Sequence, residues 1–266
     1  GKSALIEALM GFQFNQVGGG TKTRRPIALR MQYNPRCAQP VCFLTTEAGQ
    51  EERRSLQEIQ AYIEAENQRL ERDPVRCFDS REIVVRMEYK YCPNMIIIDT
   101  PGLLVSPKGR HLSPQQRALV QAAREAEALV LQKMKCKDYV ILCVEDLTDW
   151  KHASTRNFVQ QVDPELSRTV IVTPKLDTKL PQFGTGSDLK DFLQADLLKK
   201  FYPHLLGGPF FTSVPCGRVG ATREHQFFSN EAFVHGIRRL EKEDIMTVER
   251  SLGPDGLQDV NARVGV

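Results

Sequence analysis

The sequence predicts an α/β fold with a doubly wound, mostly parallel sheet. The apolar run 95–98 ends abruptly in Asp99-Thr100-Pro101-Gly102, as a buried strand does at the edge of such a sheet. The chain opens with Gly1-Lys2-Ser3, and the helix-like stretch that follows has a glycine, Gly11, placed to end it. After residue 113, strand-like and helix-like segments alternate as they do in βαβ units.

The first residues match the second half of a Walker A loop, which binds phosphate. In that pattern, Lys2 neutralises the β- and γ-phosphate charge and Ser3 ligates Mg²⁺, while backbone N–H groups from Gly1 to Ala4 face the phosphates. Gly-Lys-Ser alone often arises by chance. Followed by a strand that delivers Asp99 to the Mg²⁺ water shell and Gly102 to a terminal phosphate, it predicts a nucleotide site.

The glycine-rich loop 18–23 leads into an alternating strand predicted at 27–33. At the end of this loop, Thr23 would place its hydroxyl on Mg²⁺ and its backbone near the attacking water, as the first switch of a GTPase does. A glycine-rich linker with a solvated basic tail fits the composition equally well. The position of the loop after Lys2 favours the switch.

Lys175-Leu176-Asp177 follows the β-branched run 169–173 and predicts recognition of a base. A fixed carboxylate accepts N1–H and the exocyclic amine of guanine in a forked pair, whereas adenine has no such donor pair. The lysine stem packs over the base. Alone, Lys-x-Asp carries little information; after the two earlier motifs, it favours GTP and disfavours the alternative of an ATP-using P-loop protein.

The 75 residues between Thr23 and Asp99 predict an insertion that enlarges the sheet. It comprises a short strand at 41–44, a helix at 55–72 and an alternating strand at 83–89. Further on, Ser113 and Gln116 form a capping-box pattern around a proline, which predicts a helix to about residue 135. The remaining predicted elements are strands at 139–144, 169–173 and 210–214, a helix between the first two of these, a helix at 229–245, and a loop to 266.

The length of 266 residues predicts one domain, 1–266, truncated at both ends because the chain begins inside the Walker A pattern. The formal net charge of +3 is small and dispersed, which argues against a nucleic-acid partner. The seven cysteines include no C-x-x-C pair and indicate reduced thiols in a cytosolic-type compartment. No apolar run is long enough to span a bilayer, so any membrane contact is expected outside this chain.

Together, these motifs resemble the GTPase domain of the dynamin family, and Thr23-Arg24-Arg25-Pro26 is the most specific of them. The runs 4–15, 59–67 and 209–215 resemble the dynamin-related proteins that constrict dividing plastids in plants and algae. The resemblance implies a P-loop GTPase fold, GTP hydrolysis with Mg²⁺, and self-association through G domains. It further implies membrane fission at the cytosolic face of the plastid division site.

The resemblance also implies roles for single residues. Gly18 and Gly20 match backbone positions that hold a monovalent cation, K⁺ or Na⁺. Thr23 matches the residue that orients the catalytic water, and Asp149 matches an acidic residue that reaches the active site of a paired domain. The implied catalytic residues are Lys2, Thr23, Gly102 and Asp149, and those implied to bind nucleotide also include Leu176 in the third motif and Pro215 and Gly217 in the fifth GTPase loop.

Two features of the sequence bear on catalysis, and two departures from the family pattern bear on base binding. Leu103 stands where Ras-like GTPases have a water-positioning glutamine, so pairing in trans is expected to complete the site. Pro174 replaces the usual threonine before Lys175, and the fifth loop lacks its asparagine. The phosphate-loop residues that would precede Gly1 are absent, so this chain by itself is expected to be poorly active.

One alternative from a different functional class remains open. In it, the chain is a GTP-dependent binding switch that hydrolyses slowly and recruits a partner, and a separate protein supplies the missing catalytic group. The two hypotheses differ in how turnover depends on protein concentration.

Overall fold

A computed structural model describes residues 1–13, 23–73, 77–103, 113–146, 154–219 and 226–265. The chain divides into two compact units, one formed by Gly1–Gln13 with Cys136–Val266 and the other by Phe14–Lys135. Both contain helices and strands, which confirms the predicted α/β class. That the two units belong to a single domain stays a prediction.

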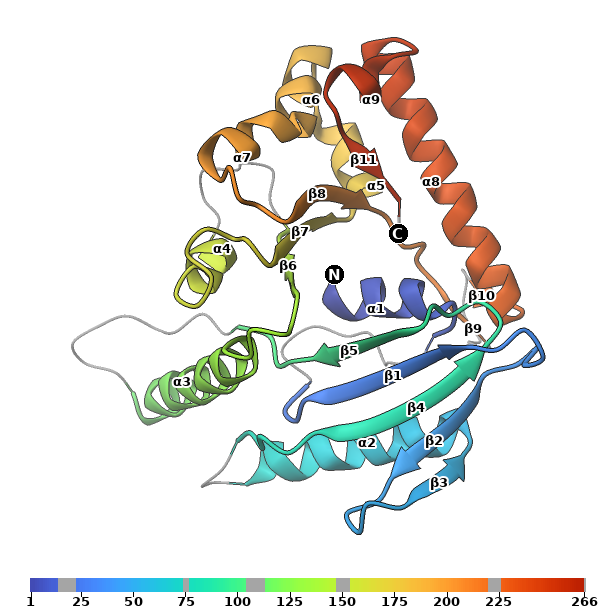
Figure 1. The fold of residues 1–266 in the computed structure, drawn as a ribbon, viewed down its shortest axis with the longest axis vertical. Helices are drawn as coiled ribbons and strands as arrows, with labels where there is room; N and C mark the ends of the chain where they lie inside the picture. Colours follow the sequence, from blue (N-terminus) through green and yellow to red (C-terminus); the bar gives the residue numbers. More distant parts are fainter. Residues whose placement is uncertain (14–22, 74–76, 104–112, 147–153, 220–225, 266) are drawn as a thin grey trace. The chain divides into compact units, whose positions relative to one another are not determined.

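The first unit contains a four-stranded parallel sheet in the order β11-β8-β7-β6 (Figure 1). Because the strands are parallel, their carboxyl ends lie along one edge, where α/β proteins bind ligands. Helix α1 precedes them in the chain and ends at Gly11, whose φ of 74° is left-handed, as predicted. The bounds of these elements are α1 (Lys2–Met10), β6 (Ile141–Val144), β7 (Thr169–Pro174), β8 (Gly207–Thr212) and β11 (Arg263–Val264).

The long helix α8 (Asn230–Leu252) contacts α5, α6, α9 and β11 and is seen along its length in Figure 1. Its Val248 is fully buried in a core with Leu176, Phe192 and Phe211. The other elements of this unit are α4 (Ser154–Val159), α5 (Leu176–Lys179), the 3₁₀ helix η2 (Leu180–Gln182), α6 (Gly186–Leu193), α7 (Ala195–Phe201), β9 (Arg218–Val219), β10 (Gln226–Phe227) and α9 (Gly256–Asp259).

The second unit contains a five-stranded mixed sheet in the order β3-β2-β4-β1-β5. Strand β1 pairs with β4 in parallel and with β5 in antiparallel orientation, and β2 pairs antiparallel with both β3 and β4. The alternation predicted for β4 is confirmed, since its odd-numbered residues are all buried. The bounds are β1 (Ile27–Tyr33), β2 (Val41–Thr45), β3 (Glu51–Arg54), β4 (Ile83–Tyr89) and β5 (Met95–Asp99).

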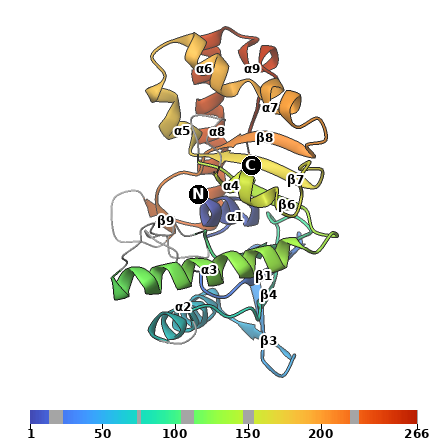
Figure 2. The same cartoon turned by 90° about the vertical axis from the view of Figure 1, so that its left-hand side faces the viewer.

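The two helices of the second unit begin where the sequence predicts. Helix α2 (Leu56–Arg72) has a complete capping box between Ser55 and Glu58. Helix α3 (Pro114–Met134), seen side-on in Figure 2, has one between Ser113 and Gln116. In both, the side chain of the N-cap serine accepts a hydrogen bond from a backbone N–H of the first turn. The side chain of the third helical residue in turn accepts from the backbone N–H of that serine. Helix α2 buries an apolar face, and α3 packs alanine and leucine side chains against Phe78.

Several predicted elements are wrong in detail. The strand predicted at 139–144 begins only at Ile141, because Tyr139 and Val140 are 44% and 57% exposed. The last long strand runs from 207 to 212 instead of 210 to 214, and α8 continues to Leu252. The tail predicted as a loop contains α9 and β11. The insertion strands β2 and β4 do lie in one sheet with β1 and β5.

Strand β3 was not predicted, because its four residues, Glu51–Arg54, are all charged. It pairs with β2 at the edge of the sheet, where charged side chains remain in water and discourage further strand pairing. No helix in the described ranges is both long and apolar enough to cross a membrane. The seven cysteines are all described, and none forms a disulfide.

Candidate functional site

The predicted phosphate-binding end of the first unit is the start of α1. Its N-cap is Gly1, which has no side chain of its own to cap the N–H groups of the first turn. A Cβ at Gly1 would lie 3.1 Å from Pro174 Cγ, which shows how closely the start of α1 approaches the end of β7. Lys2, Ser3 and Ala4 form the first turn and are half-buried. A helix start with a glycine at its N-cap is the kind of position that suits a phosphate.

The predicted base-reading motif follows β7 directly. Lys175 has a left-handed φ of 61°, which turns the chain from the strand into the short helix α5. Leu176 is fully buried in the core beside Phe211. The side chain of Lys175 is 52% exposed and Asp177 is half-buried. The apolar anchor at Leu176 thus holds the loop while its two polar neighbours reach the surface.

Asp146 is a site residue that sequence reasoning missed. It follows β6, the strand next to β7, and its carboxylate binds the ammonium groups of both Lys175 and Lys179, the latter at 2.9 Å. Burial raises the pKa of Asp146, but the hydrogen bonds from the two lysines outweigh burial and hold it below its usual range. Lys179 also donates to the Pro174 carbonyl at 2.8 Å. The only sequence signal was a carboxylate at the end of a buried strand.

The predicted fifth loop is joined to the segment after α1. Gln13 Nε2 donates a hydrogen bond to the Gly217 carbonyl at 2.7 Å, across 204 residues of sequence. Gly217 has a φ of 123°, a backbone conformation that favours glycine. Pro215 and Gly217 are both half-buried. The fifth loop, the base-reading motif and the start of α1 therefore all belong to one compact unit.

In the second unit, strand pairing places Asp99 near the predicted switch. Asp99 is the last residue of β5, is 2% exposed, and lies opposite Ile27 in the antiparallel pair with β1. Thr23, which is half-buried, precedes Ile27 by only four residues. Gly102 is half-buried and Leu103 is 38% exposed. Two predicted Mg²⁺ ligands thus come from the same end of one strand pair.

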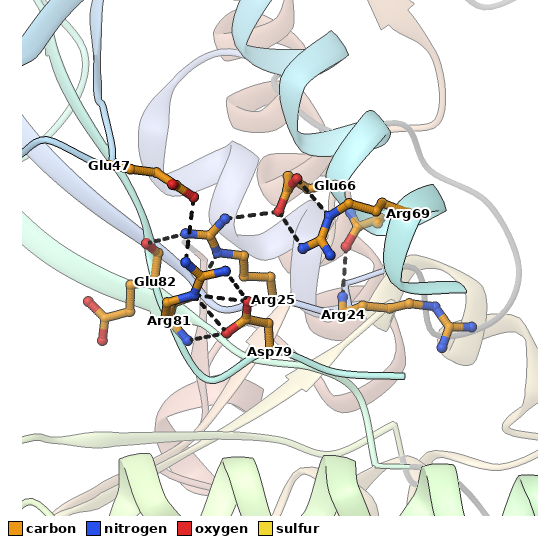
Figure 3. A network of polar contacts seen from close by, with 9 residues as sticks. Arg24, Arg25, Glu47, Glu66, Arg69, Asp79, Arg81 and Glu82 are labelled. Carbon is orange, nitrogen blue, oxygen red and sulfur yellow. Dashed lines mark hydrogen bonds and ion pairs between the residues drawn. The ribbon is translucent and has the colours of Figure 1, made fainter. Parts of the chain in front are cut away.

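A polar network holds the backbone just after Thr23 (Figure 3). Arg25 is 5% exposed, and its guanidinium donates to the Glu66 carboxylate at 2.9 Å and to the Arg81 and Glu82 carbonyls at 2.8 and 3.4 Å. Glu66 lies on α2 and also pairs with Arg69. A hydrogen bond from Arg69 and then one from Arg25 hold the pKa of Glu66 below its usual range, although burial opposes the shift.

Two contacts from helix α2, at Asn67 and Glu71, and one from Phe78, which follows the helix, hold the neighbouring residue, Arg24. The backbone N–H of Arg24 donates to Asn67 Oδ1 at 2.8 Å, which fixes the peptide bond directly after Thr23. The Arg24 guanidinium donates to Glu71 at 3.2 Å and lies over the Phe78 ring, 5.5 Å from its centroid. The helix in the insertion therefore anchors the backbone directly after Thr23, at the end of the predicted switch.

The structure thus groups the predicted site residues into two sets. The first unit holds Gly1, Lys2, Ser3, Ala4, Lys175, Leu176, Asp177, Pro215 and Gly217, and the second holds Thr23, Asp99 and Gly102. Gly18, Gly20 and Asp149 lie outside the described residues. The three predicted Mg²⁺ ligands, Ser3, Thr23 and Asp99, are divided between the units, so their common site stays a prediction.

Comparison with known proteins places these observations in a family. A sequence model of the dynamin family matches residues 1–176. The chain is 50% identical to dynamin-like protein ARC5 of Arabidopsis thaliana, in an alignment that covers 100% of this chain and 34% of that protein. It is 26% identical to dynamin-related protein 5A of Arabidopsis thaliana, over 92% of this chain and 28% of that protein. It is 28% identical to human dynamin-3, over 74% of this chain and 21% of that protein. The chain spans about a third of the length of the first of these relatives.

Proposed function

Because this chain belongs to the dynamin family, we propose that it is the GTP-binding and GTP-hydrolysing domain of a mechanoenzyme that constricts membranes. The observation that carries the proposal is the close approach of Gly1 to Pro174, where even a Cβ would be crowded; it brings the start of α1 to the end of the strand that precedes Lys175-Leu176-Asp177. A phosphate-binding helix start and a guanine-reading carboxylate are thereby combined in one compact unit.

The residues of the first unit fit the two ends of a GTP molecule. Lys2 and the first turn of α1 suit the phosphates, and Asp177 suits the N1–H and amine of guanine. Ser3 and Asp99 have the oxygen chemistry that Mg²⁺ prefers, and Mg²⁺ when bound neutralises charge on the phosphates. Lys175 is held by Asp146, so its stem is already ordered for packing over a base.

We assign the orientation of the attacking water to Thr23. The support is positional, since Thr23 precedes the anchored Arg24-Arg25 segment and lies four residues before the partner of Asp99. Leu103 offers no hydrogen-bonding group in place of a glutamine. Catalysis is therefore proposed to need a second G domain, which supplies Asp149, and a monovalent cation held at Gly18 and Gly20.

The cellular role follows from the kind of relative that the sequence resembles. We propose that the whole protein self-associates on a membrane neck at the cytosolic face of dividing plastids. The support is the resemblance in 4–15, 59–67 and 209–215 and the identity with a plant dynamin-like protein. Membrane contact is assigned to regions outside this chain.

The test is GTP turnover per molecule of the full-length protein, measured against protein concentration with K⁺ or Na⁺ present. Turnover that rises with concentration supports self-activation by pairing, whereas a flat, slow rate would support the binding-switch alternative. Competition of ATP against labelled GTP tests the base preference. Retained GTP binding with no turnover at any concentration would overturn the enzymatic part of the proposal.

The Thr23→Ala variant tests the catalytic assignment. Turnover should fall at least about tenfold while GTP affinity stays within about twofold, because a water-orienting group acts mainly in the transition state. Thr45→Ala is the matched control, because this half-buried threonine ends β2 in the same unit and has no assigned role. Equal turnover in Thr23→Ala and wild type would exclude the role given to Thr23.

A further inference from the structure

Helix α8 carries a buried carboxylate that the proposed function does not use. Asp244 is 4% exposed, and among the described residues its one hydrogen-bond partner is the hydroxyl of Ser213, with no lysine or arginine paired to it. Burying a carboxylate without a cation costs free energy of folding. Within the described part of the chain, the hydrogen bond to Ser213 is therefore the contact that indicates what Asp244 does.

Ser213 connects this carboxylate to the base-reading motif. It directly follows β8, is 1% exposed, and its Oγ donates to Asp244 Oδ2 at 2.5 Å. The same oxygen accepts the backbone N–H of Asp177 at 2.9 Å. A serine hydroxyl has one hydrogen. Because Asp244 takes that hydrogen, the lone pairs of the oxygen remain directed at Asp177.

The N–H of Asp177 needs such an acceptor. It lies in the first turn of α5, where backbone N–H groups have no intrahelical partner. Such groups are usually capped by the side chain of the N-cap residue. Here the N-cap is Lys175, whose ammonium group cannot accept a hydrogen bond, and it makes no cap contact. Ser213, which directly follows β8, supplies the acceptor that the N-cap residue lacks.

We propose that Asp244 is a positioning residue for guanine recognition, which acts through Ser213 to hold the backbone of Asp177. The inference rests on the proposed function, in which the Asp177 carboxylate accepts two hydrogen bonds from guanine. With Asp244 in place, the serine hydroxyl has one orientation and the first turn of α5 is fixed. Without it, the hydroxyl is free to rotate and the carboxylate loses its fixed direction.

The electrostatics agree with this geometry. Burial raises the pKa of Asp244 to about 6, the hydrogen bond from Ser213 opposes that rise, and the charge of Asp177 adds to it, followed by Glu243 and Glu241. The relay itself consists of two hydrogen bonds, at 2.5 and 2.9 Å, that join α8 to the base-reading loop through Ser213 within one unit.

The test compares affinity for GTP and for inosine triphosphate, which lacks the exocyclic amine, in the full-length protein. Asp244→Ala and Ser213→Ala should each lower the GTP preference, the ratio of the two affinities, by about fivefold, the worth of one ordinary hydrogen bond. Asp244→Asn keeps an oxygen that accepts from Ser213, so its ratio should stay within about twofold of wild type. A merely structural defect would lower the affinities for both nucleotides by the same factor and leave their ratio unchanged.

The controls separate this inference from the function on which it rests. Asp177→Ala should abolish the GTP preference; if it does not, the proposed base recognition fails. If Asp177→Ala abolishes it but Ser213→Ala and Asp244→Ala both leave the ratio unchanged, only the positioning role is overturned. If Asp244→Asn loses as much of the GTP preference as Asp244→Ala does, the positioning role is also overturned. Should Asp244→Ala fail to fold, the affinity ratios of Ser213→Ala and Asp244→Asn are compared instead. The positioning role requires a lowered ratio in the first and a nearly unchanged ratio in the second.

Discussion

The segment after Thr23 and the loop at Asp177 are held in opposite ways. In the second unit, Arg24 and Arg25 are fixed by a network in which α2 supplies Glu66, Asn67 and Glu71. In the first unit, the backbone of Asp177 is held by one hydroxyl, backed by one carboxylate. The network is redundant and charged, whereas the relay is a single chain of contacts.

The difference follows from the groups that must be satisfied. A buried guanidinium has five N–H donors and one positive charge, so it requires several acceptors and at least one carboxylate. A single backbone N–H requires only one acceptor. The comparison suggests that the network at Arg25 chiefly determines stability, and that the relay at Asp177 chiefly determines selectivity.

The largest effect is expected for Glu66→Ala. The variant leaves the Arg25 guanidinium buried with only carbonyl partners, and should lower the free energy of unfolding by about 3 kcal/mol. Denaturant unfolding followed by circular dichroism measures the loss. Arg69→Ala is the control, since its side chain is 50% exposed and its loss should cost less than about 1 kcal/mol. Equal losses would show that Arg25 does not depend on Glu66.

Asp244→Asn should raise the free energy of unfolding, whereas Glu66→Ala should lower it. The folded protein holds the pKa of Asp244 at about 6, against an ordinary 3.8, so between these values the folded state binds more protons than the unfolded state. The free energy of unfolding therefore decreases as pH rises from 4 to 6, by about 3 kcal/mol for this group. Removing the charge should make the variant more stable than wild type by about 2 kcal/mol at pH 7.5.

This gain should disappear at pH 4, where the wild-type carboxyl is already protonated in the folded state. Denaturant titrations of both proteins from pH 4 to 7.5 measure it. A constant difference across this range would mean that Asp244 titrates normally. If Asp244→Asn is more stable than wild type and keeps the GTP preference, the buried charge of Asp244 lowers stability while its oxygen serves to accept from Ser213. Glu66 would then differ from Asp244, because its charge is needed for stability.

An intermediate effect is expected at Asp146. Asp146→Ala removes the carboxylate from Lys179, which is 4% exposed, and leaves its ammonium only the Pro174 carbonyl among the described residues, so stability should fall by about 1–2 kcal/mol. Lys175→Ala removes the other, half-exposed partner and should cost less than about 1 kcal/mol. Unfolding curves of the two variants check the order; a reversed order would contradict the view that Lys179 is the dependent partner.

Features set by neighbouring residues were predictable from the sequence. The capping box at Ser113 located the start of α3, and the apolar periodicity after Ser55 located that of α2, because both patterns lie within a few turns of the chain. The alternation in β4 and the left-handed Gly11 are equally local. The motifs identified the chemistry for the same reason, since each is a short run placed after a strand or before a helix.

Contacts between distant residues were not predictable. Ser213 and Asp244 are 31 residues apart, and Arg24 and Asn67 are 43 apart. Whether they meet depends on strand register and helix placement, which no local pattern records. Asp146 meets Lys175 only because β6 and β7 are adjacent in the sheet. The sequence therefore indicated the groups that would contact a nucleotide, but not the residues that hold those groups in place.

Apart from the two control variants, the smallest effect on stability, and the sharpest test of the comparison, is expected for Asn67→Ala. It removes the acceptor of the Arg24 N–H but leaves both arginine side chains bound, so the loss should be about 1 kcal/mol. If the network also positions Thr23, kcat of the full-length protein should fall severalfold with KM unchanged. Asn67→Asp keeps an acceptor oxygen and should restore kcat. A fall in kcat without such rescue would trace the effect to α2 as a whole and not to this bond, whereas an unchanged kcat would confine the network to stability.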